Sequence, residues 1–243
     1  MPMETEYLTA SEATGLIWTI KNPIAKHSQR RRAEVTAHLL QPKRYDSILD
    51  VGCGDGYQLS YIVRRTHRIT GIDISLKKLK VAREKVKGVD YICASSENLP
   101  FKREIFSKVM CLELLEHLPN PNKTLKEIQR VLKNVGTLIV SVPYKGNITF
   151  TLNTRGELTA LYGHLHSFDE QRLASVLPND FAILHQVYIC NIIASYPLFA
   201  FLPMRLWKLL DSLTGKLPKM KPTWFISKIK KRMFLQQTNQ CQA

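Results

Sequence analysis

The sequence predicts an α/β fold in which a mostly parallel sheet carries helices on both faces. From residue 46 onward, short apolar runs alternate with stretches of helical periodicity. This alternation is typical of parallel sheets, because a crossover helix returns the chain to the edge where the next strand begins. With 243 residues, of which 44% are hydrophobic, the chain can also bury a large core. Its near-average composition excludes a collagen, a coiled-coil rod and a largely disordered chain.

Five apolar runs are the predicted parallel strands, and each is bounded by turn residues or a helical stretch. In chain order they are 47–51, 67–72, 91–93, 108–112 and 137–142. Three helices are predicted between them, at 56–65, in the Lys-rich stretch 76–87 and at 121–132, where Leu125, Ile128, Val131 and Leu132 share one face. Because every strand is followed by a helix or a long connection, the strands are expected to run in one direction.

The remaining elements complete the sheet. Asp169 and Glu170 suit the first turn of a helix predicted at 168–177, because acidic groups are favoured near a helix N-terminus. Two closing strands are predicted at 181–190 and 223–229. They bring the sheet to seven strands, of which the last is expected to be antiparallel.

The composition along the chain predicts four parts. Residues 1–45 form an N-terminal helical cap, with a helix expected at 26–40. The core is formed by 46–192 together with 222–232. Residues 193–221 are an apolar and basic helical insertion, and 233–243 are a tail.

The most specific motif follows the first predicted strand, where Asp50 precedes Gly52, Gly54 and Gly56. Glycines let a ligand approach the backbone, and open α/β sheets bind ligands at this edge. A dinucleotide site is the alternative, with Asp73 as its ribose-binding acid. The GxGxG spacing and the carboxylate before the turn disfavour a pyrophosphate. They favour a ligand with ammonium and sulfonium charges, which describes S-adenosylmethionine (SAM).

Four motifs in order resemble the class I SAM-dependent methyltransferases, in the branch that includes ubiquinone and menaquinone C-methyltransferases. They occupy 48–56, 71–75, 95–101 and 112–118. The resemblance covers about residues 46 to 190. It implies a Rossmann-like fold and transfer of a methyl group from SAM, with S-adenosylhomocysteine as the product.

The resemblance also implies which residues bind the cofactor. They are Asp50, Gly52, Cys53, Gly54, Gly56, Asp73, Ile74, Ser95, Ser96 and Leu112. Asp73 should accept hydrogen bonds from both ribose hydroxyls, while Asp50 should face the methionine moiety. Ser95 stands where many relatives carry an aspartate, so the contact with the adenine amino group should be weaker by about 1 kcal/mol.

A general base is needed only when the methyl acceptor is a hydroxyl or an acidic C–H group. Four residues are candidates because they follow the fourth and fifth strands or precede the helix at 168–177. They are His117, Tyr144, His164 and His166. A structural hydrogen-bonding role is the alternative for each loop histidine. The five cysteines are scattered and form no CxxC pair, so no metal-binding residues are predicted.

The formal charge of +15 is concentrated in two flanking segments. Residues 21–44 hold seven Lys/Arg and one Glu (net +6), and 205–232 hold nine Lys/Arg and one Asp (net +8). Such segments indicate a surface that meets phospholipid headgroups or nucleic-acid phosphates, with a solvated basic face as the alternative.

The apolar run at 181–204 contains no charged residue, but Pro197 and Pro203 interrupt it. Once the closing strand is removed it is too short for a membrane span. The amphipathic pattern that follows suggests a lid over the acceptor, an element at the membrane interface, or both.

Together these observations favour a methyltransferase with a small, apolar or lipid-linked acceptor, and O-, N- and C-methylation all suit the motifs. The acidic N-terminus differs from a secretory signal, so a cytoplasmic location is predicted, with peripheral attachment to the inner face of the membrane. The alternatives are an RNA or tRNA methyltransferase that uses the basic surface and a non-catalytic methyltransferase-like binding protein. No Asn/Asp-Pro-Pro-Tyr/Phe signature follows the fourth strand, which disfavours nucleic acid.

Overall fold

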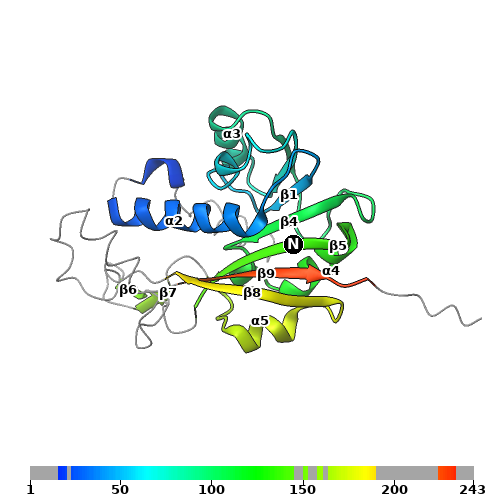
Figure 1. Ribbon diagram of the computed structural model, residues 1–243. Coiled ribbons are helices and arrows are strands. Elements are labelled where there is room, and N and C mark those ends of the chain that lie inside the picture. The colour runs from blue at the N-terminus through cyan, green and yellow to red at the C-terminus, as the bar shows by residue number, and fades with distance from the viewer. Residues whose placement is uncertain are drawn as a thin grey trace, which may run out of the picture.

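The computed structural model describes residues 16–20, 23–144, 150–152, 158–160, 164–189 and 224–233 (Figure 1). A seven-stranded sheet runs through it in the order β3-β2-β1-β4-β5-β9-β8. Its strands are β1 (Ser47–Val51), β2 (Arg68–Asp73), β3 (Asp90–Cys93), β4 (Phe106–Leu112), β5 (Leu132–Pro143), β8 (Phe181–Ile189) and β9 (Trp224–Lys231). The first five strands pair in parallel, and β9 is antiparallel to both β5 and β8. The predicted α/β fold with an antiparallel last strand is therefore confirmed.

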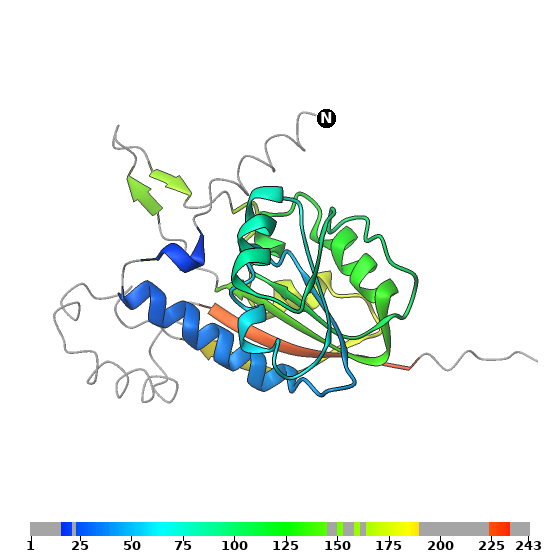
Figure 2. The ribbon, with the colours of Figure 1, turned by 90° about the horizontal axis from the view of Figure 1, so that it is seen from above.

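Helices cover both faces of the sheet. They are α2 (Pro23–Leu40), α3 (Leu76–Lys85), α4 (Pro121–Val131) and α5 (Glu170–Val176). Successive residues of β1 show how the two layers form: Ile48 packs in one core with Leu40 of α2, and Leu49 packs in the other with Leu125 of α4. A strand alternates its side chains between faces, so α2 and α4 lie on opposite sides of the sheet (Figure 2).

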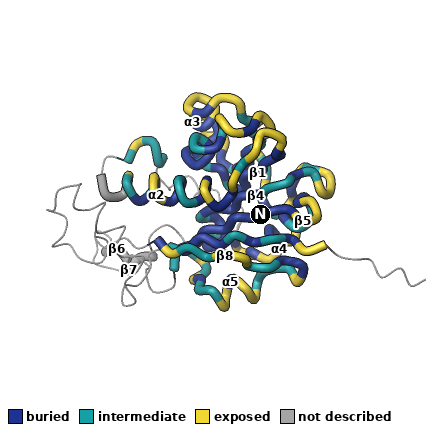
Figure 3. The backbone as a smooth tube through the Cα atoms, in the orientation of Figure 1, coloured by how far each residue is buried: buried dark blue, intermediate teal, exposed yellow. Residues whose placement is uncertain are grey.

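Burial explains why the central strands are continuously apolar. All residues of β1 are buried, and Val109, Met110 and Cys111 of β4 are fully enclosed. A parallel sheet with helices on both faces has no solvated side, so its strands cannot alternate with polar residues. Figure 3 shows this buried centre surrounded by more exposed helices.

The helix starts follow from capping residues. The side chains of Ser75, Asn120 and Asp169 accept hydrogen bonds from backbone N–H groups in the first turns of α3, α4 and α5. Each such cap satisfies a donor that the helix cannot, which contributes about 1 kcal/mol. Pro121 at the start of α4 adds a preset backbone angle.

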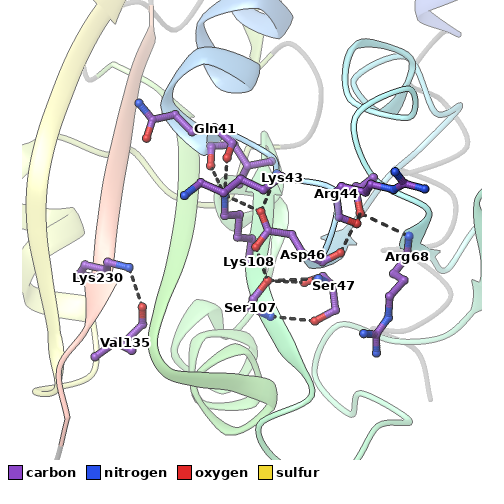
Figure 4. Close-up of polar contacts among 12 residues, drawn as sticks. Gln41, Lys43, Arg44, Asp46, Ser47, Arg68, Ser107, Lys108, Val135 and Lys230 are labelled. Atoms are coloured by element: carbon purple, nitrogen blue, oxygen red, sulfur yellow. Dashed lines mark hydrogen bonds and ion pairs between the residues drawn. The ribbon is translucent and has the colours of Figure 1, made fainter.

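A buried ion pair fixes the edge of the sheet opposite the glycine turn. Lys108 Nζ lies 2.8 Å from Asp46 Oδ2 and also donates to the backbone carbonyl of Leu40 (2.8 Å) at the end of α2 (Figure 4). Ser107 Oγ donates to the other carboxylate oxygen of Asp46 (2.9 Å). Burial opposes ionisation of Asp46, but the hydrogen bonds from Lys108, Lys43 and Ser107 outweigh it and lower its pKa.

The structure differs from the sequence prediction in two places. The helix predicted at 56–65 is a set of turns around the 3₁₀ helix η2 (Leu59–Tyr61). There Ser60 Oγ donates to the Tyr57 carbonyl, so a side chain competes with the regular backbone ladder. The hairpin formed by β6 (Phe150–Leu152) and β7 (Leu158–Ala160) was not predicted.

Two predicted parts lie outside the described residues: the insertion at 193–221, and the tail apart from Met233. Within the described part of the chain, no helix is both long enough and apolar enough to cross a membrane.

Candidate functional site

A tight glycine turn ends β1. Gly52 and Gly54 have φ angles of +75° and +55°, a region that L side chains rarely adopt. The N–H groups of Gly52 and Cys53 both donate to the Ile72 carbonyl (2.8 Å each), so the turn is tied to β2. A Cβ atom at Gly54 would have no atom within 4 Å, so this glycine faces open space where a ligand can approach the backbone.

Asp73 at the end of β2 connects the glycine turn to α3. Its Oδ2 accepts from Gly54 N (2.9 Å) and its Oδ1 from Ser75 N (2.8 Å). A carboxylate has about four acceptor positions, so both oxygens can accept further hydrogen bonds. Asp73 is therefore held in place while keeping the capacity to bind hydroxyl groups.

Asp50 is a buried acid beneath the turn, with a relative exposure of 2%. Burial raises its pKa to about 8, and the charge of Asp73 adds to the shift. Cys53 is buried beside it, and burial together with the nearby carboxylates raises the pKa of its thiol. The ionised form of Asp50 is therefore costly unless a cation lies nearby, so its position beneath the turn favours a cationic ligand. Cys53 remains a neutral thiol.

The predicted adenine-binding residues lie after the ends of β2 and β3. Ile74 follows β2, and its carbonyl accepts from Cys93 Sγ (3.4 Å). Ser95 is exposed and accepts from Glu97 N (3.2 Å), whereas Ser96 is buried against Thr124, with 3.0 Å between the hydroxyls.

Leu112 is buried at the end of β4. All the predicted cofactor residues therefore lie along the carboxyl edge of β1, β2, β3 and β4, or in the loops that follow these strands.

The 3₁₀ helix η1 (Ile17–Thr19) covers the glycine turn. Asp55 accepts from the backbone N–H groups of Ile17 and Trp18, while Trp18 Nε1 donates to the Asp55 carbonyl (2.8 Å). Next to this contact is a cavity of about 340 Å³, lined by Ile17, Trp18, Lys26, Gln29, Tyr57, Ser60 and Tyr61. The sequence motif included Asp55 without indicating that it fixes the N-terminal cap.

The loop after β4 holds a second acidic group. Glu113 pairs with Arg32 of α2 at 2.9 Å and accepts from Ser141 Oγ at 2.8 Å. The guanidinium of Arg32 also lies 5.6 Å from the ring centre of Trp224 in β9. Arg32 thus joins α2 to β4 and β9, a role that no local sequence pattern predicts.

Two of the predicted bases come together. The rings of His117 and His164 lie 4.8 Å apart at 66°. His117 ends the 3₁₀ helix η3 (Leu115–His117), and the N–H groups of Leu165 and His166 both donate to the Glu116 carbonyl (2.7 and 3.1 Å). Burial lowers the pKa of His164, against an opposing effect of Glu113, so this imidazole is neutral at neutral pH.

The other two candidates lie apart from this pair. Tyr144 packs against Tyr188 and Phe225, and burial together with Glu170 raises its pKa, so its phenol stays protonated. His166 packs against Phe168, and its Nε2 is buried with no hydrogen-bond partner among the described residues.

Glu116 is a site residue that the sequence analysis missed. Its side chain is buried beside His117, and burial followed by the charge of Glu113 raises its pKa well above the usual range. Its position next to His117, a predicted base, could have marked it as a site residue. Its proximity to His164 depends on the fold.

Comparison with known proteins agrees with this geometry. Residues 49–140 match the family described as a methyltransferase domain. The ubiquinone biosynthesis O-methyltransferase of Idiomarina loihiensis is 37% identical over 99 residues, which are 39% of this chain and 41% of that protein. The chain spans about half the length of the curated relatives that it matches.

Solved structures share the fold at low identity. A SAM-dependent methyltransferase of Mesorhizobium loti has a TM-score of 0.57 at 15% identity, covering 84% of this chain and 98% of its own. The 1,6-didemethyltoxoflavin-N1-methyltransferase of Burkholderia thailandensis, solved with bound 1,6-didemethyltoxoflavin and S-adenosylhomocysteine, has a TM-score of 0.60 at 16% identity. That match covers 95% of this chain and 88% of the other.

Proposed function

We propose that this chain, which has the class I SAM-dependent methyltransferase fold and a methyltransferase domain at residues 49–140, moves a methyl group from SAM to a small acceptor. The resemblance predicted from four sequence motifs is confirmed by the domain match and the fold. The observation that carries the proposal is the pairing of a ligand-accessible glycine turn with two buried carboxylates, Asp50 and Asp73.

These residues fit SAM by charge and by hydrogen-bonding capacity. SAM carries a sulfonium and an ammonium, and Asp50 is an acid whose ionised form needs a nearby cation. Asp73 keeps free acceptor positions for ribose hydroxyls after bonding Gly54 N and Ser75 N. A pyrophosphate-containing cofactor supplies no cation to stabilise ionised Asp50, and the charge of Asp73 would repel it.

When bound, SAM supplies a methyl group that is already activated by the sulfonium charge. The protein must therefore orient the two reactants and exclude water. In this chain η1 closes over the turn through Asp55, and Glu113 and Arg32 fix the loop after β4. His117 and His164 stand where that loop meets the segment before α5, which suits contact with the acceptor.

The acceptor that we propose is apolar or lipid-linked and carries a hydroxyl group. Two findings support this class: curated relatives are named as ubiquinone biosynthesis O-methyltransferases, and no charged residue occurs in 181–204. Comparing extracts with and without the gene for lipids that differ in mass by one methyl group would identify the acceptor.

Calorimetry with SAM tests the cofactor directly. Asp73→Asn should weaken SAM binding by roughly 10- to 100-fold, because it removes the charge from the ribose acceptor. Asp90→Asn is the matched control, since Asp90 is an exposed acid at the start of β3. Binding of NADH in place of SAM by the unmodified chain would contradict the proposal.

A further inference from the structure

Three side chains of types that can coordinate a metal ion meet beside the glycine turn. One ligand atom each from Glu116, His117 and His164 lies within 4.8 Å of the other two. The cluster is next to the proposed cofactor site, because a Cβ atom at Gly52 would lie 3.0 Å from the side chain of Leu114 in the same loop. The backbone bonds from Leu165 and His166 to the Glu116 carbonyl hold the two segments together.

The environment of the Glu116 side chain favours a cation beside it. This side chain is only 1% exposed, and neither carboxylate oxygen has a hydrogen-bond partner among the described residues. The imidazole nitrogen His117 Nε2 is 4.0 Å from Glu116 Oε1, which is too long for a hydrogen bond. A buried carboxyl group without partners is costly, and a coordinated cation removes that cost.

The neighbouring acid does not supply the missing partner. Glu113 is occupied by Arg32 and Ser141. The positive charge of Arg32 is therefore already paired. A cation between Glu116 and the two histidines would be adjacent to Glu113 as an outer carboxylate, an arrangement that is common around metal ligands.

We propose that Glu116, His117 and His164 bind one divalent transition-metal ion with a coordination position left open. Two imidazoles and one carboxylate are a common ligand set for catalytic zinc and for non-haem iron. Tetrahedral bonds of about 2.1 Å place ligand atoms about 3.4 Å apart, so modest side-chain rotations close the present spacing. This proposal revises the sequence-based expectation of no metal ligands, since His164 joins the other two only in the fold.

The role of the ion rests on the proposed function. We assign the open position to the hydroxyl oxygen of the acceptor. Coordination lowers the pKa of that hydroxyl, and its proton leaves to water. The oxygen then forms a bond to the methyl carbon of SAM while the carbon–sulfur bond breaks, and its electron pair remains on sulfur as S-adenosylhomocysteine. No oxidant or reductant is required.

Metal titration of the full chain tests the site. After dialysis against a chelator, Zn²⁺ should bind at one ion per chain by calorimetry, and Co²⁺ should give a d–d absorption band of low coordination number. Glu116→Gln and His164→Ala should each weaken binding by 100-fold or more. His67→Ala and His185→Ala are matched controls, because both histidines are exposed and lie on other elements.

The isosteric Glu116→Gln variant guards against misfolding, and SAM binding by each variant reports whether the fold is intact. Loss of the Co²⁺ band with SAM affinity preserved supports the site. Failure of the unmodified chain to bind Zn²⁺, or unchanged binding by both variants, overturns it. If the metal-free chain still binds SAM, the absence of a metal site leaves the proposed methyltransferase function standing.

Discussion

Asp50 shows how one residue can link ligand binding to protonation. Its carboxyl group has a pKa of about 8 in the folded protein, mainly because it is buried. In the unfolded chain the pKa is near 4. The folded state therefore keeps a proton that the unfolded chain releases, so the stability contributed by the neutral form is lost as pH rises toward 8.

SAM should reverse this preference, because its positive charges stabilise the ionised carboxylate. At pH 7 we expect SAM binding to release about one proton from Asp50. Calorimetry in buffers of different ionisation enthalpy measures this release as a change in the apparent binding enthalpy. Asp50→Asn should abolish the buffer dependence, and the exposed Asp90→Asn control should retain it. Buffer-independent enthalpy in the unmodified chain would contradict the assignment.

At the same scale, the sequence reveals some site residues better than others. Asp50 and Asp73 could be predicted because each lies in a short local motif at the end of a strand. Arg32 and His164 could not be assigned their partners, because those partners lie on distant parts of the chain. Such contacts depend on the packing of α2 and of the segment before α5, which no local pattern specifies.

At the scale of elements, the strands were predicted well because a sheet buried on both faces requires uninterrupted apolar runs. The helix α4 was predicted from apolar residues at helical spacing, and α5 from the acidic residues that suit its first turn. The capping side chains at the starts of α3, α4 and α5 agree with these predictions. The turns around η2 were mistaken for a helix. Leu59, Ile62 and Val63 pack in or against one core at the i, i+3, i+4 spacing of a helix, so the apolar pattern alone does not distinguish these turns from a helix.

The edge of the sheet opposite the site depends on one ion pair. Lys108→Ala should lower the free energy of unfolding by about 3 kcal/mol, because it leaves Asp46 buried without its charged partner. It also removes donors from the carbonyls of Leu40 and Gln41 that end α2. Urea denaturation measures the loss. Lys102→Ala is the control, since this exposed lysine should change stability by less than about 0.5 kcal/mol. Equal effects of both variants would show that the ion pair contributes nothing.

At the scale of the whole molecule, α2 of the first basic segment and β9, the described strand of the second, come together. Helix α2 contacts β9 at the surface of the sheet. Lys228 and Lys230 follow Ile226 at alternate positions of β9, and Ile226 packs in the core that α2 covers. Their side chains therefore point to the α2 side, where Lys228 and Lys108 add to the effect of burial in lowering the pKa of Lys230. This concentration of positive charge predicts an anion-binding face.

The exposed part of α2 tests whether that face meets a membrane. Lys26, Arg30 and Arg31 are exposed on it, and each basic group near an anionic bilayer contributes about 1 kcal/mol. Replacing all three with Glu should weaken binding to phosphatidylglycerol vesicles, measured by co-sedimentation, by about 100-fold or more. Added salt should also weaken vesicle binding by the unmodified chain. Replacing Lys77, Lys80 and Lys85 of α3 with Glu changes the net charge by the same amount. This control therefore distinguishes an effect of the α2 surface from an effect of the net charge. Equal losses for the two triple variants, or tight binding to tRNA with none to vesicles, would contradict a membrane-facing role for α2.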